Sequence, residues 1–182
     1  MEKARIILIS GSPGTGKTTI ARILAENSGY NKAVQIEVDI FWQFISKGYI
    51  HPWENGSGDQ NEIVVESAAA AAKSYAKGGY EAFVAGTIGP WFIGPWLELA
   101  REGFDVRYVI LRPGEAETVS RAAMRKQRDF FPLNADIIID IRNSFLDLGV
   151  YETNAIDTTG QTADESAATV GNMITAGCFK VY

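Results

Sequence analysis

Apolar residues in this chain form short continuous runs that alternate with longer segments of helical spacing. The short runs, which predict strands, cover about 4–10, 33–38, 80–86, 104–111 and 153–157. The helical segments cover about 17–28, 40–47, 60–77, 91–102, 114–127, 135–147 and 162–176. Strands that alternate with helices in this way are typical of a parallel sheet with crossover helices. At 182 residues, the pattern predicts a single α/β domain over 1–182.

The segment 59–77 carries the clearest helix signals. Asp59 is a suitable N-cap, Glu62 stands three residues later as a capping-box partner, and the Gly-Gly pair at 78–79 provides a stop. The preceding stretch 48–58 is rich in turn residues and has no sustained period, so we expect a long loop there. Long loops in compact domains are usually functional or mobile.

A glycine-rich stretch at 11–19, GSPGTGKTT, follows the first predicted strand and opens the first predicted helix. Gly11, Gly16, Lys17 and Thr18 fill the pattern of a phosphate-binding loop. Its glycines let backbone N–H groups turn toward an anion, its Lys reaches the β- and γ-phosphates, and its Thr hydroxyl binds Mg²⁺. The expected nucleotide-binding residues of the loop are Gly11, Ser12, Pro13, Gly14, Thr15, Gly16, Lys17, Thr18 and Thr19.

Charge and composition narrow the choice of partners. Asp and Glu outnumber Lys and Arg by 22 to 17, and the net charge of −5 offers no general attraction to nucleic acid. Cys178 is the only cysteine, so no intramolecular disulfide can form, which suits a reducing compartment. The apolar run at 6–9 is far too short for a signal sequence or a membrane span. We therefore expect a cytoplasmic protein whose partners are neither nucleic acid nor membranes.

Asp39 follows the second predicted strand, where a ligand site is expected. In open parallel sheets, ligands bind beyond the carboxyl ends of the strands, so this carboxylate would lie near the phosphate loop. A positioned Asp can align an acceptor hydroxyl and take its proton, which makes Asp39 our candidate general base. Asp is also a preferred helix N-cap, and Asp39 precedes the predicted helix at 40–47. The two roles are compatible.

Three arginines near the end of the fifth predicted helix share one face. Arg121, Arg125 and Arg128 are spaced by four and three residues, which places them on the same side of a helix. Guanidinium groups in such a position can close over a triphosphate and neutralise the charge of the moving phosphoryl group. The alternative is a solvated basic face, and the spacing is compatible with both.

Aromatic residues gather after the second and third predicted strands. They are Phe41, Trp42, Phe44, Tyr49 and Trp53 in the first group and Trp91, Phe92 and Trp96 in the second. Such side chains could line an apolar acceptor pocket, since ligand pockets combine aromatic walls with a few polar groups. Ordinary packing of helices on the sheet is the alternative for part of them. His51, the only histidine, is interpreted as exposed or as a minor substrate contact, because one histidine cannot define a metal site.

Taken together, these motifs resemble small P-loop kinases of the chloramphenicol phosphotransferase-like, shikimate kinase-like and gluconate kinase-like group. The resemblance covers nearly the whole chain and rests on the loop at 11–19, Asp39, the stretch 121–128 and the Thr-Thr-Gly turn at 158–160. It implies a three-layer P-loop NTPase fold with a five-stranded parallel sheet in the order 2-3-1-4-5, helices on both faces and a small lid at about 121–137. The nearest likeness is to bacterial members without an assigned acceptor.

The resemblance also implies roles for individual residues. In such families, arginines of the lid cover ATP, which implies nucleotide binding for Arg121 and a catalytic role for Arg125 and Arg128. The turn after the fifth strand borders the adenine, which points to Thr159 and Gly160. ATP is implied as the nucleotide because these families use it.

The third predicted strand departs from the pattern of the group. Relatives often end this strand in Asp-Gly, where the carboxylate helps to hold magnesium or its water ligands, but this chain has Ala85 before Gly86. Magnesium would then depend on Thr18, the phosphates, water and Asp39, which is chemically reasonable because Mg²⁺ commonly keeps several waters.

The expected function is ATP-dependent transfer of the γ-phosphoryl group to a hydroxyl of a small, partly apolar acceptor, with Mg²⁺ as the metal. Catalysis is assigned to Lys17, Asp39, Arg125 and Arg128, and metal binding to Thr18. One alternative is an ATP- or GTP-binding module, or a slow NTPase, without metabolite kinase activity. A second is a nucleic-acid end kinase, which the acidic charge balance disfavours. Acceptor-stimulated ADP release with a phosphorylated product would separate the first alternative from a kinase.

Overall fold

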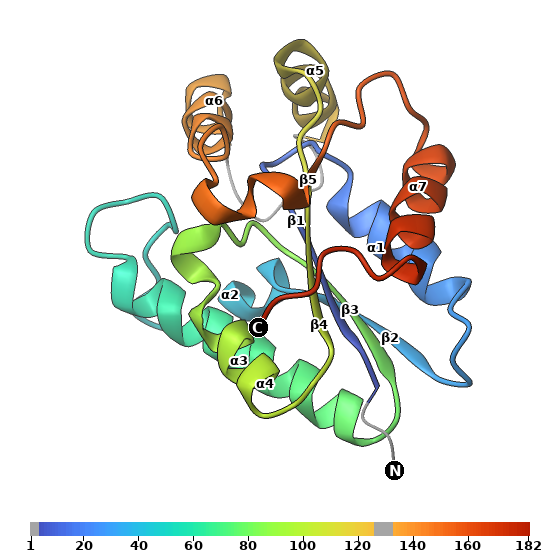
Figure 1. The fold of residues 1–182 in the computed structure, drawn as a ribbon. Coiled ribbons are helices and arrows are strands. Elements are labelled where there is room, and N and C mark those ends of the chain that lie inside the picture. Colours follow the sequence, from blue (N-terminus) through green and yellow to red (C-terminus); the bar gives the residue numbers. More distant parts are fainter. Residues whose placement is uncertain (1–3, 126–132) are drawn as a thin grey trace.

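The computed structural model describes residues 4–125 and 133–182 as an α/β domain built on one sheet. Its five strands lie in the order β2-β3-β1-β4-β5, and every pair is parallel, as Figure 1 shows. The strands are β1 (Ile6–Ser10), β2 (Ala33–Glu37), β3 (Glu81–Ala85), β4 (Val106–Leu111) and β5 (Ala155–Ile156). This confirms the predicted fold class and the strand order 2-3-1-4-5.

Helices cover both faces of the sheet. The α-helices are α1 (Lys17–Glu26), α2 (Asp39–Gln43), α3 (Gly58–Lys77), α4 (Gly94–Arg101), α5 (Glu115–Arg125), α6 (Ala135–Asn143) and α7 (Ala163–Thr175). The 3₁₀ turns are η1 (Pro90–Phe92) and η2 (Gly149–Asn154). Helices α1 and α7 lie on one side of the sheet and α3 and α4 on the other, while α5 packs against α6 near the carboxyl ends of the strands (Figure 1).

Strand β1 divides the core into two layers because successive side chains of a strand point to opposite faces. Ile6 and Leu8 pack in the cluster that includes α3 and α4, whereas Ile7 and Ile9 pack in the cluster that includes α1 and α7. All four side chains have no exposed surface. A strand that is covered on both faces has apolar residues at successive positions. The sequence therefore predicted β1 well.

Two predicted helix starts are wrong. Helix α3 begins at Gly58 after Ser57, and no side chain caps it, so the predicted capping box of Asp59 and Glu62 is not formed. Helix α2 begins with Asp39 itself after Val38, so Asp39 is not an N-cap, and the helix spans only five residues. In both places the chain enters the helix already in helical backbone conformation, and a side-chain cap has no role there.

The predicted helix at 91–102 is divided into two elements. Turn η1 starts with Pro90, and α4 starts afresh at Gly94 with Pro95 in its first turn. Proline is tolerated at these positions because the first-turn N–H groups have no partner within the helix. The second proline therefore marks a new helix start rather than the interior of one long helix.

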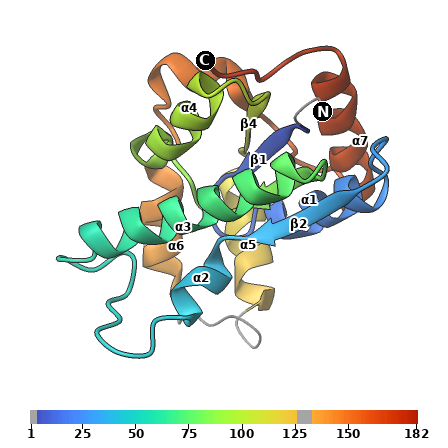
Figure 2. The same ribbon diagram turned by 90° about the horizontal axis from the view of Figure 1, so that it is seen from below.

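The predicted lid at about 121–137 falls partly on 126–132, outside the described residues. Figure 2 shows that α2 follows β2 and lies beside α3. None of the helices in the described part of the chain is long and apolar enough to span a membrane.

Candidate functional site

The phosphate loop joins β1 to α1 in a conformation that requires glycine. Gly11, Gly14 and Gly16 have φ values of 139°, 86° and 91°. A Cβ atom on Gly11 would lie 2.4 Å from the carbonyl oxygen of Leu111, and one on Gly14 would lie 2.4 Å from that of Thr118. The loop is therefore packed between the end of β4 and α5, and only glycine fits at these two close approaches.

The side chain of Lys17 bonds to the backbone of the phosphate loop. Its side chain is buried, and its Nζ donates a hydrogen bond of 2.9 Å to the carbonyl oxygen of Ser12. The Thr15 hydroxyl donates to the same carbonyl at 3.0 Å. Because Lys17 is also the first residue of α1, the ammonium group and the positive end of the helix lie at the same loop. This combination suits an anion such as a nucleotide phosphate.

Glu37 is a site residue that the sequence analysis missed. It ends β2, and its Oε1 accepts a hydrogen bond of 3.0 Å from the Thr18 hydroxyl. In the pairing of β2 with β3, Glu37 stands opposite Ala85. A signal was present, since Gln35 and Glu37 alternate with apolar residues and share one face of the strand.

The residues around Thr18 suit magnesium only in part. The described residues contain no group of three or more His, Cys, Asp or Glu side chains that could hold a metal ion. The hydroxyl of Thr18 and the carboxylate of Glu37 are hard oxygen donors of the kind that Mg²⁺ prefers, and they lie within hydrogen-bond distance of each other. These two groups therefore fit Mg²⁺ that takes its remaining ligands from phosphates and water.

A cavity of about 910 Å³ opens beside the phosphate loop. Lys17, Thr18, Glu37 and Asp39 all line it, so the structure brings the candidate base into the same space as the loop. The aromatic and histidine side chains in its lining are Trp42, Tyr49, His51, Trp53, Trp91 and Phe92. Trp96 is instead fully buried in the core, so the aromatic residues divide between pocket and packing.

One wall of this cavity is formed by the aromatic residues of the loop 48–57. The Tyr49 hydroxyl and His51 Nδ1 lie 3.2 Å apart, and the His51 ring stacks on Trp53 with centroids 4.9 Å apart and planes inclined by 10°. Burial raises the pKa of Tyr49, and the nearby Glu54 raises it further, so the phenol keeps its proton at neutral pH. We call Tyr49, His51 and Trp53 the loop wall.

Helix α3 holds the loop wall in place. Gln60 binds both backbone groups of Ile50, accepting from its N–H at 2.9 Å and donating to its carbonyl at 2.7 Å. Asn61, which is buried, accepts from Trp42 Nε1 at 3.0 Å and donates to the Pro52 carbonyl at 2.8 Å. These bonds pair polar groups of the loop and of α2 that are buried or partly buried, and so tie the loop wall to α3.

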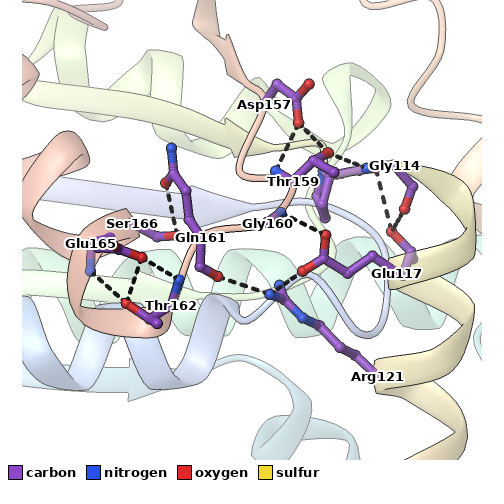
Figure 3. Close-up of polar contacts among 12 residues, drawn as sticks. Gly114, Glu117, Arg121, Asp157, Thr159, Gly160, Gln161, Thr162, Glu165 and Ser166 are labelled. Carbon is purple, nitrogen blue, oxygen red and sulfur yellow. Dashed lines mark hydrogen bonds and ion pairs between the residues drawn. The ribbon is translucent and has the colours of Figure 1, made fainter.

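A second cavity of about 290 Å³ lies between the phosphate loop, α5 and the start of α7. Arg121 lines it, pairs with Glu117 and donates a hydrogen bond of 3.0 Å to the carbonyl of Gln161 (Figure 3). The other lining residues are Gly14, Thr15, Gly16, Thr19, Ile20, Gln161, Thr162, Ala163 and Ser166. Arg121 thus joins α5 to the turn after β5.

The turn after β5 is held by hydrogen bonds with Gly114 and with Glu117 of α5. The N–H of Gly160 donates to Glu117 at 2.9 Å, and the Thr159 hydroxyl accepts from the N–H of Gly114 at 2.7 Å (Figure 3). Hydrogen bonds from the hydroxyl and the N–H of Thr159 hold the pKa of Asp157 below its usual range. Neither Thr159 nor Gly160 is among the lining of the second cavity, which the chain reaches with Gln161 and Thr162.

The structure does not describe the side chains of the other two predicted arginines. Arg128 is outside the described residues, and of Arg125 only the backbone, as the last residue of α5, is described. Their predicted roles therefore stay predictions.

Comparisons with known proteins identify a family and the fold. A family model described as an AAA domain matches residues 7–137. No curated protein sequence matches the chain. Among solved structures, the tunicamycin resistance protein of Deinococcus radiodurans has a TM-score of 0.66 at 20% identity, and 99% of each chain is covered.

Two kinases have the same fold. A sugar kinase from Janibacter superposes with a TM-score of 0.67 at 18% identity over 94% of this chain and 95% of its own. The APS kinase of Mycobacterium tuberculosis, solved with AMPPNP and APS, superposes with a TM-score of 0.66 at 16% identity over 96% and 99%. At such identities the likeness establishes the fold alone.

Proposed function

The chain belongs to the AAA domain family, with a P-loop fold, and from that premise we propose that it is an ATP-dependent phosphotransferase acting on a small hydroxylated acceptor. Its kinase neighbours support nucleotide-dependent phosphoryl transfer in general. The observation that carries the proposal is that Lys17 of the phosphate loop and Asp39 line one cavity, which has room for a second substrate.

The nucleotide is proposed to lie along the phosphate loop. Loop N–H groups, the start of α1 and the Lys17 ammonium would bind the phosphates, because each presents positive charge to the same point. The second cavity, beside Arg121 and Gln161, would take the adenosine end. ATP is the proposed nucleotide, and a related fold has been solved with its analogue AMPPNP.

Magnesium is proposed to bind next to Thr18. The Thr18 hydroxyl and the Glu37 carboxylate would hold the ion or its water ligands. When bound, the ion neutralises negative charge on the β- and γ-phosphates. The sequence analysis gave Asp39 a part in holding magnesium. We propose that Glu37 has this part instead, so that Asp39 is left to bind the acceptor.

Asp39 is proposed to orient the acceptor hydroxyl and accept its proton. The bond between the hydroxyl oxygen and the γ-phosphorus forms as the bond from that phosphorus to the β–γ bridging oxygen breaks, and ADP leaves. Holding both reactants in one cavity supplies much of the rate because it removes the entropy cost of their encounter. Arg125 and Arg128 are proposed to neutralise charge on the moving group.

A screen with Mg·ATP and a panel of hydroxylated metabolites tests this function. We expect one class of acceptor to stimulate ADP release and to yield a product heavier by one phosphoryl group in mass spectrometry. With that acceptor, Asp39→Asn should lower turnover by about 100-fold while ATP affinity stays unchanged. ATP binding without acceptor-stimulated ADP release across the panel would instead support a nucleotide-binding module or a slow NTPase.

A further inference from the structure

We infer that His51 donates a hydrogen bond from its Nε2 to the acceptor molecule, and that Tyr49 sets the imidazole tautomer that makes this possible. The inference rests on the proposed function, because it names a binding residue and a positioning residue for the second substrate. His51 belongs to the loop wall and lines the same cavity as Lys17 and Asp39. The ring contacts of His51, its bond to Tyr49 and the exposure of its Nε2 support the inference.

Contacts on two sides hold the His51 ring in one orientation. The ring stacks on that of Trp53, with centroids 4.9 Å apart, and meets the Tyr49 ring edge to face, with centroids 5.3 Å apart. Side chains of α3 bond to the backbone of Ile50 and Pro52, the residues before and after His51. The two nitrogens of an imidazole point in directions that the ring plane fixes, so a held ring has a defined direction for each nitrogen.

Tyr49 determines which nitrogen of His51 carries the proton. The Tyr49 hydroxyl and Nδ1 lie 3.2 Å apart, so one of these atoms donates to the other. A phenol that donates to the bare ring nitrogen pairs the more acidic donor with the more basic acceptor. Burial and the nearby Glu54 raise the pKa of Tyr49, so the hydroxyl keeps the proton that it donates. Nδ1 is then the acceptor, and the proton of the neutral ring is on Nε2.

The second nitrogen of the His51 ring is open to solvent. Among the described residues, the buried side-chain polar atoms without a hydrogen-bond partner are Trp96 Nε1, Arg142 Nε and Thr158 Oγ1. His51 Nε2 is not one of these atoms, and the described part of the chain makes no hydrogen bond with it. An open N–H group on a ring that lines the cavity can donate to a ligand oxygen.

The acceptor should therefore carry a second oxygen besides the hydroxyl that is phosphorylated. Asp39, which is proposed to accept the proton of that hydroxyl, lines the same cavity as His51. One accepting group and one donating group would orient the molecule through two polar contacts, as ligand pockets commonly do. Because Nε2–H is a neutral donor, a hydroxyl, carbonyl or carboxylate oxygen would each satisfy it.

NMR of the full chain without ligand tests the tautomer. His51 is the only histidine of the sequence, so labelling the ring nitrogens of histidine gives the signals of one ring. At about pH 8.5, above the usual titration range of histidine, we expect a protonated Nε2 and an unprotonated Nδ1. Tyr49→Phe should move the Nδ1 signal toward that of a mixed tautomer population, whereas Tyr75→Phe, which alters an exposed tyrosine of α3, should not. A protonated Nδ1 in the wild type, or an unmoved signal in Tyr49→Phe, would overturn the inference.

The same signals test the donor role with the panel of hydroxylated metabolites. Each compound is added to the full chain loaded with Mg·AMPPNP, and we expect the compound that is phosphorylated in the screen to shift the Nε2 signal in a saturable way. A phosphorylated compound that leaves Nε2 unmoved would contradict the donor role and leave the proposed function standing. A saturable shift without product from any compound would contradict the proposed function and leave the donor role standing. No shift with any compound would overturn the donor role.

Two variants at position 51 separate a donor at Nε2 from a general need for the ring. His51→Gln keeps an amide N–H near the position of Nε2, and His51→Asn keeps one near that of Nδ1, while both remove the ring. With the phosphorylated acceptor, His51→Asn should raise the KM of the acceptor about fivefold to tenfold, with kcat and the KM of ATP little changed. His51→Gln should stay within about twofold of the wild type. Equal acceptor KM values in the two variants would contradict a donor at Nε2.

Discussion

Glu37 and Ala85 stand opposite each other at the carboxyl ends of β2 and β3, and Glu37 accepts a hydrogen bond of 3.0 Å from the Thr18 hydroxyl. The sheet edge therefore presents a carboxylate on one strand where its neighbour presents only a methyl group. Because paired residues of adjacent strands are close in space, a carboxylate on β2 can serve nearly the same point as one on β3. We therefore expect that Ala85 is no obstacle to the proposed magnesium site beside the phosphate loop.

Glu37→Gln should weaken the effect of magnesium on nucleotide binding. The amide is the same size as the carboxylate but lacks its charge, so we expect the gain in ATP affinity caused by Mg²⁺ to fall by about tenfold. Titration calorimetry with and without Mg²⁺ measures this gain, and metal-free affinity should not decrease. Glu26→Gln, at the exposed end of α1, is the control. An unchanged Mg²⁺ effect in Glu37→Gln would remove Glu37 from the metal site.

Lys17→Ala should abolish tight nucleotide binding. The ammonium group is directed into the loop by its bond to Ser12, and losing a charged donor to phosphate costs about 3 kcal/mol, or roughly 100-fold in affinity. Calorimetry with AMPPNP gives the affinity, and circular dichroism checks that the variant is folded. Lys47→Ala serves as the control on an exposed lysine. Comparable affinities for the two variants would contradict the assigned role.

Gly14→Ala should destabilise the contact between the phosphate loop and α5. A Cβ atom there would lie 2.4 Å from the carbonyl of Thr118, in a backbone with φ 86°. We expect the free energy of unfolding in urea to fall by roughly 1–3 kcal/mol, because the helix must move and the backbone is strained. Gly29→Ala should change it little, since nothing lies within 4 Å of that position. Equal effects of the two variants would show that the loop tolerates side chains.

Asn61→Ala should release the loop 48–57. It removes the acceptor of Trp42 Nε1 and the donor to the Pro52 carbonyl, and leaves buried polar groups without partners. We expect a loss of about 2 kcal/mol in unfolding free energy and faster proteolytic cleavage within the loop. Asn27→Ala, which removes a bond on the exposed surface, is the comparison. Unchanged cleavage in Asn61→Ala would mean that other contacts hold the loop.

Asp157 should make stability depend on pH in the acid range. Hydrogen bonds from Thr159 lower its pKa in the folded state below the ordinary value of 3.8, so the ionised form is favoured by folding. Its contribution is complete above the ordinary value and is lost as the pH falls through the lowered one. The difference in unfolding free energy between the wild type and Asp157→Asn should therefore shrink below about pH 4. A difference that stays constant down to strongly acid pH would contradict this.

Helix boundaries show where sequence reasoning was weakest. Strong local signals at Asp59 and Glu62 predicted a cap, yet α3 starts one residue before Asp59. Tertiary contacts explain the difference, because Asn61 and Ser57 bind the loop carbonyl of Pro52 and set the start of the helix. Capping rules describe isolated helix ends, and a helix end that is bonded to a neighbouring loop follows other constraints.

Sequence reasoning also found some residues of the candidate site and missed others. The phosphate loop could be found from the sequence because it directly follows the buried apolar strand β1, and Asp39 was singled out because it comes shortly after β2. Glu37 was missed, because the alternation of β2 shows only which face it shares with Gln35, and its importance depends on Thr18 and Ala85, which are distant in the chain. Arg121 was assigned to a triphosphate from its spacing, and its partners Glu117 and Gln161 became visible only in the fold.

The sequence by itself determined the α/β class and the position of the phosphate loop, and its motifs carried the family resemblance that implies the strand order. The class and the loop follow from local spacing, since a run of apolar residues or a pattern of glycines acts on its own few residues. Only the tertiary structure decided that Glu37 stands beside Thr18, that Asp39 shares a cavity with Lys17, and that α3 fixes the loop wall. Those relationships join residues brought together by strand order and helix packing, and no local pattern specifies their distances.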